Sequence, residues 1–286
     1  MGFSLFCPLG SHTLLGKHRN GGFELQRSSS LLRRDVGFSF LKHETCPQSR
    51  AVLCRCEPAD FEERKSANEV RKEIERCYDL INNIGRGVVY LGSSRMGPDH
   101  LHYSQAFKLA REAKIQQIAK LLDCTSWSGA GPGLMDAATK GALEAGKPVG
   151  GFKIGKEASE WTTSNYHPYL PSESYLTCRF FSTRKHGSVD AAVRKSNSDR
   201  AAVVALPGGI GTLDEIFEIM ALIQLERVGY ELPVPFLLMN YDSFYSKLLD
   251  FLDDCKSWGT VSEGEVGSVW KVCDNNSEAL EYLSEF

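Results

Sequence analysis

The sequence predicts an α/β fold: a single doubly wound, Rossmann-like domain in which helices flank a parallel sheet. Short apolar segments alternate along the chain with longer segments that have helical periodicity. The apolar segments are continuous runs, such as 201–206 (AAVVAL), and such runs are typical of parallel strands buried on both faces. Glycine-bearing stretches follow three of these runs, at the strand ends where such sheets bind ligands.

The predicted strands are short, mainly apolar runs bordered by turn-forming or polar residues. In chain order they cover 87–91 (GVVYL), 125–128, 149–153, 201–206, 234–239 and 269–272. The predicted helices share apolar residues at helical spacing and strong helix formers. In chain order they cover 57–82, 102–122, 134–144, 180–196, 212–226, 241–254 and 277–286. Residues 154–178 are rich in aromatics, and we expect them to be irregular.

The overall composition is that of a soluble globular protein. The chain has 286 residues, of which 42% are hydrophobic and 24% charged. A formal net charge of −3 gives no sign of nucleic-acid binding, and no apolar run approaches the roughly 20 residues that span a membrane. The nine cysteines form no CxxC pair. We therefore expect no nucleic-acid partner, no membrane partner and no metal site.

The first 56 residues differ from the rest of the chain. They contain eight Lys or Arg, three acidic residues and seven Ser. A basic, Ser-rich, acid-poor N-terminus is typical of an organellar transit peptide, and 52–56 (VLCRC) resembles a chloroplast processing site. We expect a disordered chloroplast-type transit peptide over 1–56 and the α/β domain over 57–286. A mitochondrial address and an untargeted tail on a cytoplasmic protein are the alternatives.

The most informative stretch is 206–215 (LPGGIGTLDE), which follows a strand and opens a helix. Gly208, Gly209 and Gly211 let the backbone turn and approach a ligand, and free N–H groups at a helix N-terminus favour a phosphate. Thr212 can cap the helix or donate its hydroxyl. The spacing fits neither a Walker A loop nor a dinucleotide fingerprint, which disfavours ATP hydrolysis and a conventional NAD site. A plain glycine-rich turn is the alternative.

Two further loops end at the same predicted sheet edge. Gly131 and Gly133 follow the strand at 125–128, and Gly92 and Ser93 follow the strand at 87–91. Because the carboxyl ends of parallel strands lie at one edge, we expect these residues to join the phosphate or ribose site. Tight turns without a ligand are the alternative for each loop.

Glu215 lies in the first turns of the helix that follows the glycine loop. The helix dipole favours acids there, so good helix design is one explanation. A carboxylate beside a phosphate site is repelled by the phosphate, however. Its chemistry suits a sugar hydroxyl, a water molecule or a developing cation instead.

Residues 207–215 (PGGIGTLDE) fit the PGGxGTxxE signature of the LONELY GUY family, which is often mislabelled "lysine decarboxylase". Three upstream blocks agree with that family in order: VYLGSSR, SGAGPGLMDAA and RFFSTRK, at 89–95, 128–138 and 179–185. The resemblance covers nearly all of 86–250. The middle block is more similar to the GGGPGxMEAA form of the wider family than to the short plant form.

The resemblance implies a phosphoribohydrolase that acts without a cofactor. Such an enzyme hydrolyses the N-glycosidic bond of a nucleoside 5′-monophosphate, here a cytokinin ribotide or an AMP-like purine, to free base and ribose 5-phosphate. The resemblance also implies a homodimer. By position, Glu215 matches the acidic residue that contacts the ribose and takes part in catalysis. Arg184 matches the active-site arginine, Lys185 lies beside it, and 208–212 match the phosphate-binding segment.

The chain departs from the family pattern between Lys185 and Pro207. These residues are 22 positions apart, more than the resemblance leads us to expect, and the interval holds a second Arg-Lys pair that begins at Arg194. Arg194 is therefore the alternative active-site arginine. The altered spacing also leaves open a non-catalytic nucleotide-binding or sensor protein of the same fold.

Literal lysine decarboxylation needs a pyridoxal phosphate bound to a lysine as a Schiff base, with an acid or arginine at the ring nitrogen. The sequence offers no such context, and we expect no organic cofactor.

Overall fold

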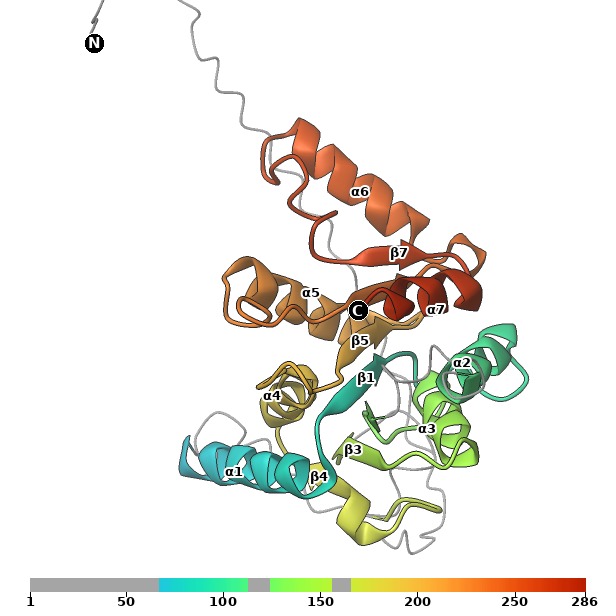
Figure 1. Ribbon diagram of the computed structural model, residues 1–286, viewed down its shortest axis with the longest axis vertical. Helices are drawn as coiled ribbons and strands as arrows, with labels where there is room; N and C mark the ends of the chain where they lie inside the picture. Colours follow the sequence, from blue (N-terminus) through green and yellow to red (C-terminus); the bar gives the residue numbers. More distant parts are fainter. Residues whose placement is uncertain (1–66, 113–123, 156–165) are drawn as a thin grey trace, which may run out of the picture. The chain divides into compact units, whose positions relative to one another are not determined.

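A parallel sheet organises the computed structural model, in which residues 67–112, 124–155 and 166–286 are described (Figure 1). Within these residues the sheet has seven strands in the order β4-β3-β2-β1-β5-β6-β7, and every neighbouring pair is parallel. The strands are β1 (Gly87–Leu91), β2 (Thr125–Ser128), β3 (Val149–Ile154), β4 (Tyr175–Cys178), β5 (Ala202–Ala205), β6 (Phe236–Met239) and β7 (Lys271–Cys273). The predicted doubly wound α/β fold is confirmed.

Helices connect the strands and cover both faces of the sheet. They are α1 (Ala67–Ile84), α2 (Leu101–Glu112), α3 (Leu134–Glu144), α4 (Phe181–Ala192), α5 (Ile210–Gln224), α6 (Ser246–Ser257) and α7 (Asn276–Ser284). Helices α1, α4, α5 and α6 contribute to one apolar cluster against the sheet, and α2, α3 and α7 contribute to another. None of the described helices is long and apolar enough to cross a membrane.

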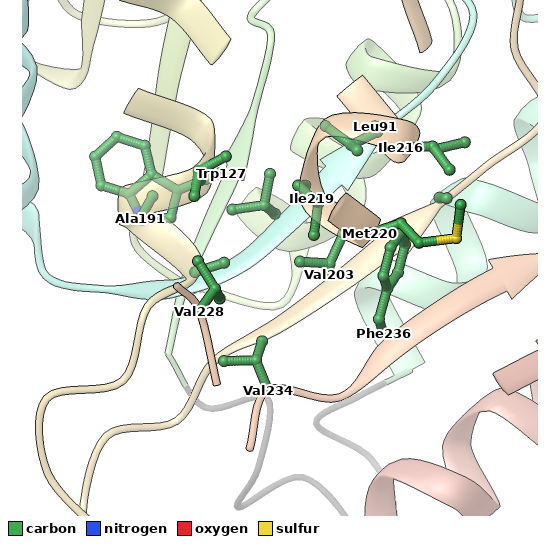
Figure 2. Close-up of a cluster of buried hydrophobic side chains, with 14 of the residues drawn as sticks. Leu91, Trp127, Ala191, Val203, Ile216, Ile219, Met220, Val228, Val234 and Phe236 are labelled. Atoms are coloured by element: carbon green, nitrogen blue, oxygen red, sulfur yellow. The ribbon is translucent and has the colours of Figure 1, made fainter. Parts of the chain in front are cut away.

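The two clusters explain why the strand sequences are continuous apolar runs. Along β1, Val89 and Leu91 belong to the cluster with α5, whereas Val88 and Tyr90 belong to the cluster with α2 and α3. Successive strand side chains point to opposite faces, so a sheet covered on both sides needs an apolar residue at every position. Figure 2 shows the first cluster, in which Val203 lies among the α5 side chains.

The strand order reverses direction between β1 and β5. From β1 the chain adds β2, β3 and β4 on one side, and from β5 it adds β6 and β7 on the other side. The two following loops therefore diverge at the carboxyl ends of β1 and β5 and leave a crevice there. This switch point is where doubly wound sheets bind ligands.

Some predicted elements differ from the structure. The expectation of an irregular 154–178 is wrong at its end, because Tyr175–Cys178 forms the edge strand β4. Its side chains alternate between half-buried and buried, so it lacks the continuous apolar run of the other strands. The predicted helix over 241–254 is divided into a 3-10 turn at Tyr241–Ser243 and the helix α6, because Asp242 and Ser243 adopt positive φ angles.

Other predictions fall partly or wholly outside the described residues. The transit segment 1–56 lies outside them, as do the first ten residues of the predicted helix over 57–82 and the 113–122 part of the helix predicted over 102–122. The helix predicted over 180–196 ends at Ala192. Beyond it, the Asp199 carboxylate accepts hydrogen bonds from the backbone N–H groups of Lys195 and Ser196 and forms a turn instead.

Candidate functional site

A pocket of about 470 Å³ lies at the switch point of the sheet. The loops after β1 and β5 form much of its wall, and α3, α4 and the end of β3 complete it. Its lining residues are Gly92, Ser93, Ser94, Arg95, Met135, Ile154, Phe181, Arg184, Gly209, Ile210, Gly211, Thr212 and Glu215. The glycine loops after β1 and β5 thus meet at one pocket, as parallel strands require.

Backbone hydrogen bonds of Ser93 connect the loop after β1 with the loops after β2 and β5. Its N–H donates to the Pro207 carbonyl at 3.0 Å, and its own carbonyl accepts from the Leu134 N–H at 2.8 Å. A Cβ on Gly133 would lie 2.3 Å from that same Ser93 oxygen, so only glycine fits. Gly133 also has a φ of 72°, which favours glycine. Gly131 and Gly133 are not lining residues, and Gly133 serves the contact between two loops.

The glycines after β5 divide into two kinds. A Cβ on Gly208 would lie 2.2 Å from the Thr212 hydroxyl oxygen, so Gly208 makes room for packing inside the loop. A Cβ on Gly209 or Gly211 would meet nothing within 4 Å, because these positions face the open pocket. Gly92, which follows β1, also makes room for packing, since a Cβ there would lie 3.1 and 3.2 Å from the Leu134 and Leu206 side chains.

Helix α5 begins at Ile210 with Gly209 as its N-cap, so the alternative in which Thr212 caps the helix is wrong. The first intrahelical bond runs from the Leu213 N–H to the Gly209 carbonyl at 2.9 Å. The N–H groups of Ile210, Gly211 and Thr212 precede it and have no acceptor inside the helix. They carry the positive end of the helix dipole and line the pocket, so the pocket has a site that suits an anion.

Glu215 and Arg184 meet at the pocket wall. The Arg184 Nε lies 3.5 Å from the Glu215 Oε1, and the two side chains are only 8% and 5% exposed. The Glu215 Oε1 accepts no hydrogen bond from the described residues, because 3.5 Å gives charge attraction rather than a well-formed bond. Glu215 thus lines the pocket with a carboxylate group whose Oε1 is buried beside Arg184.

The loop after β2 holds the Arg184 side chain in place. A Cβ on Gly129 would lie 2.3 Å from the Arg184 Nη2, so the glycine leaves the space that the guanidinium occupies. The same Nη2 donates to the Met135 sulfur at 3.6 Å, and the guanidinium carbon lies 5.5 Å from the centre of the Phe181 ring. The glycine loop after β2 thus contributes to the pocket by leaving space for the Arg184 side chain.

The environment raises the pKa of Glu215 above that of an ordinary glutamate. Burial of the carboxyl group is the main cause, the nearby Arg184 charge counteracts it in part, and the negative charges of Asp214 and Glu218 add to the increase. Carboxyl groups that exchange protons during catalysis are commonly tuned upwards in this way.

Lys185 follows Arg184 on α4 but is not a lining residue. Its Nζ lies 3.0 Å from the Asp214 Oδ2 and 3.0 Å from the Glu218 Oε2 on α5. Burial alone lowers the pKa of this amine, but the hydrogen bonds to the two carboxylates outweigh burial and raise it. Lys185 therefore joins α4 to α5 beside the pocket.

Arg194 lies at the opposite edge of the sheet. Its guanidinium donates to the carbonyls of Asp199 and Pro233, at 3.1 and 2.9 Å. These residues precede β5 and β6, so they belong to the amino edge of the sheet. The structure places Arg184, and not Arg194, in the pocket with Glu215.

Several lining residues were absent from the predicted site. Arg95 is exposed at the pocket wall, and among the described residues it forms no ion pair. Its place directly after a strand and a Gly-Ser-Ser turn was the signal that could have identified it. Met135, Ile154, Phe181 and Ile210 give the pocket an apolar part, but their sequence context does not distinguish them from core residues. The described residues hold no group of three or more His, Cys, Asp or Glu that could bind a metal ion.

Comparisons with known proteins identify a family that matches this chain. Residues 135–283 match the family described as "Possible lysine decarboxylase". The rice (Oryza sativa subsp. japonica) protein "Probable cytokinin riboside 5'-monophosphate phosphoribohydrolase LOGL3" is 30% identical over 177 residues, which are 62% of this chain and 73% of that protein. Its rice relative LOGL2, named for the same activity, is 29% identical over 207 residues, or 70% of this chain and 72% of that protein. Among solved structures, the molybdenum cofactor binding protein of Rippkaea orientalis has a TM-score of 0.42 and 17% identity, and the match covers 70% of this chain and 94% of that chain.

Proposed function

This chain belongs to the LONELY GUY family, whose description is "Possible lysine decarboxylase", and from that premise we propose that it is a nucleoside 5′-monophosphate phosphoribohydrolase. The observation that carries the proposal is the Glu215 carboxylate, which is buried at the wall of the pocket whose floor is the N-terminus of α5. A single ligand can therefore meet an anion site and a buried carboxylate together.

The 5′-phosphate binds at the start of α5. The N–H groups of 210–212 donate to its oxygens, and Arg95 supplies a positive charge from the loop after β1. Gly209 and Gly211 allow close approach because their α-carbons carry no side chain into the pocket. Gly211 and Glu215 are four residues apart on α5, a rise of about 6 Å, so a sugar attached to that phosphate lies beside the carboxylate.

The reaction breaks the bond between C1′ of the ribose and the base nitrogen. The bonding electron pair leaves with the base, which takes up a proton, and a water oxygen forms the new bond to C1′ and releases a proton. Positive charge develops on the sugar in between, as in glycoside hydrolysis. The Glu215 carboxylate stabilises that charge and orients or deprotonates the water. Arg184 holds the carboxylate in place at 3.5 Å.

The base occupies the apolar part of the pocket. Phe181 offers an aromatic face, and Met135 and Ile154 complete an apolar wall on the side of α3 and β3. A purine or an N6-substituted purine fits this chemistry, so cytokinin ribotides and AMP are the substrates to test first.

Lysine decarboxylation, despite the family's description, has no support in the pocket. The described lining residues include no lysine, and the amine of Lys185 is paired with two carboxylates. An absorbance spectrum of the purified protein tests this directly, because a pyridoxal phosphate Schiff base would give an aldimine band. We expect none.

The test of the proposed function is a product assay on the full chain. Isopentenyladenosine 5′-monophosphate, AMP and adenosine are incubated in parallel, and free base and ribose 5-phosphate are followed by chromatography. We expect base release from a monophosphate and none from adenosine. Monophosphate binding without base release would instead favour the non-catalytic nucleotide-binding alternative.

We also propose that residues 1–56 direct the protein to the chloroplast and that the protein is a homodimer. The basic, acid-poor composition of the N-terminal segment supports the first proposal, and the family resemblance supports the second. A fluorescent fusion of 1–56 and sedimentation of the purified chain are the corresponding tests. Cytosolic fluorescence or a monomer at micromolar concentration would contradict them.

A further inference from the structure

Helix α4, which carries Arg184, has a carboxylate from a different helix at its N-terminus. The Glu73 Oε1 on α1 accepts from the Arg179 N–H at 2.9 Å, and its Oε2 accepts from the Phe180 N–H at 3.3 Å and from the Thr183 hydroxyl at 2.7 Å. Phe180 is the N-cap of α4 and has no capping side chain of its own. Glu73 therefore binds the backbone N–H of the N-cap residue, as the N3 glutamate of a capping box does within one helix, and places a negative charge at the N-terminus of α4.

We propose that Glu73 is a positioning residue for Arg184, a role that rests on the proposed function of the pocket. Thr183, which Glu73 binds, directly precedes Arg184. The Arg184 N–H bonds to the Phe180 carbonyl at 3.3 Å and so belongs to the same first turn of α4. Glu73 thus fixes the turn from which the Arg184 side chain extends to Glu215.

The contact is built along one face of α1. Glu69, Glu73 and Cys77 are spaced four residues apart, and such residues share a helix face. Glu69 Oε2 lies 2.8 Å from the Arg179 Nη1, and the Cys77 thiol donates to the Thr183 carbonyl at 3.7 Å. Three successive turns of α1 therefore contact the segment 179–183, and α1 lies beside α4 in Figure 1.

Burial makes Glu73 the central member of this set. Glu73 is only 9% exposed, whereas the side chains in the Glu69–Arg179 pair are 50% and 43% exposed. A buried carboxylate needs hydrogen-bond donors, and the start of α4 supplies three of them to Glu73. Helix α1 precedes the residues that match the family, 135–283, so an element outside that match orders the arginine inside it.

The Arg184 side chain has little freedom to compensate for a shift of α4. Its Nη2 fills the space above Gly129, and its Nε is 3.5 Å from Glu215. Displacement of an active-site group by about 1 Å can cost roughly 100-fold in rate. Glu73→Gln keeps the shape of the side chain but turns an amide NH₂ towards backbone N–H donors. We expect it to lower base release from the monophosphate about 10- to 100-fold.

The experiment is a double-mutant cycle in the full chain, with Glu73→Gln, Arg184→Ala and the combination, read as base release and as the Kd for AMP. Because Glu73 acts through Arg184, we expect Glu73→Gln to have little further effect once Arg184 is absent. Equal losses in both backgrounds, or no loss in the single variant, would overturn the proposal. A purely structural Glu73 gives equal losses, since it changes the folded fraction in both backgrounds alike.

Two further variants complete the test. Glu75→Gln changes an acid on the solvent side of α1, where the side chain is 61% exposed, and we expect unchanged base release. Thr183→Val removes one donor to Glu73 and leaves α1 intact, so it tests the contact even where Glu73→Gln fails to fold. We expect a smaller loss in the same direction, and unchanged base release and AMP affinity would contradict the proposal. A wild-type chain that binds AMP without releasing base would refute the proposed function alone. The coupling between Glu73→Gln and Arg184→Ala in the free energy of unfolding would then still decide the role of Glu73, and additive unfolding free energies would overturn it.

Discussion

The Nε of Arg184 lies 3.5 Å from the Oε1 of Glu215, and both side chains are almost completely buried at the wall of the pocket. Removing one member of a buried ion pair leaves the other charge uncompensated, so such pairs are costly to break. Here Oε1 of Glu215 also lacks a hydrogen bond from the described residues, and both Glu215 and Arg184 line the pocket beside the start of α5. The pair is therefore arranged for a ligand as much as for stability.

The first prediction concerns pH. The pKa of Glu215 is raised mainly by burial, so the folded protein holds this proton more tightly than the unfolded chain does. The stability that Glu215 contributes is therefore present below the ordinary glutamate pKa of about 4.3 and is lost as the pH rises through the raised folded value. Relative to Glu215→Gln, the wild type should lose stability with rising pH.

Denaturant unfolding of both proteins from about pH 4 to pH 8 measures this difference. If the carboxylate is the active form, kcat/KM should also have an acid limb whose midpoint lies above about 4.3. A stability difference that is constant or grows with pH would contradict the burial account.

The second prediction separates the two arginines. Arg184→Ala should lower base release by about 100-fold or more, because it removes the partner of the buried carboxylate. Arg194→Ala should leave the rate of the folded protein unchanged but lower stability by about 1–3 kcal/mol, because three backbone carbonyls lose a charged donor. Kinetics and thermal unfolding of both variants check this. The reverse pattern would identify Arg194 as the functional arginine.

The third prediction uses the glycines after β5. Gly208→Ala places a Cβ 2.2 Å from the Thr212 hydroxyl oxygen and should destabilise the protein by about 1–3 kcal/mol. Gly211→Ala meets no neighbour and replaces a helical glycine, so stability should be unchanged or higher by up to about 1 kcal/mol. The same methyl group enters the pocket and should weaken monophosphate binding. Thermal unfolding and AMP affinity, measured together, distinguish packing from ligand contact. Unchanged AMP affinity in Gly211→Ala would exclude that position from the phosphate site.

The fourth prediction concerns Arg95, which lines the pocket beside the start of α5. Arg95→Ala should raise KM for the monophosphate about tenfold or more, the loss expected for a hydrogen bond to a charged group. Arg227→Ala is the matched control, because Arg227 is exposed beyond the far end of α5. Ribose 5-phosphate inhibition should weaken in the first variant and not in the second. Equal KM values in the two variants would show that Arg95 does not contact the phosphate.

The sequence carried enough information for the fold and for the meeting of the glycine loops. Continuous apolar runs implied a parallel sheet covered on both faces, and parallel strands bring their following loops to one edge. The edge strand β4 was missed because only Leu176 and Cys178 of its residues face the core. Alternation over four residues is too short to separate a strand from a loop.

The three-dimensional structure separated candidate residues that their positions in the sequence could not separate. Distance along the chain could not separate Arg184 from Arg194, because it does not reveal that the chain crosses to the amino edge of the sheet after α4. Glu73 resembled one more solvated charge on an amphipathic helix. A signal was present, since Glu73 lies on the same helix face as the buried Cys77 and Ile81, where an acid needs a partner.

The most direct measurement compares wild type and Glu215→Gln for AMP binding and for base release from the same monophosphate. We expect both proteins to bind AMP with similar affinity, because the phosphate contacts remain. We expect base release to fall by about 100-fold or more in the variant, the size expected for a catalytic proton-transfer group. Base release at the wild-type rate by a folded Glu215→Gln protein would show that this buried carboxylate does not perform the chemistry.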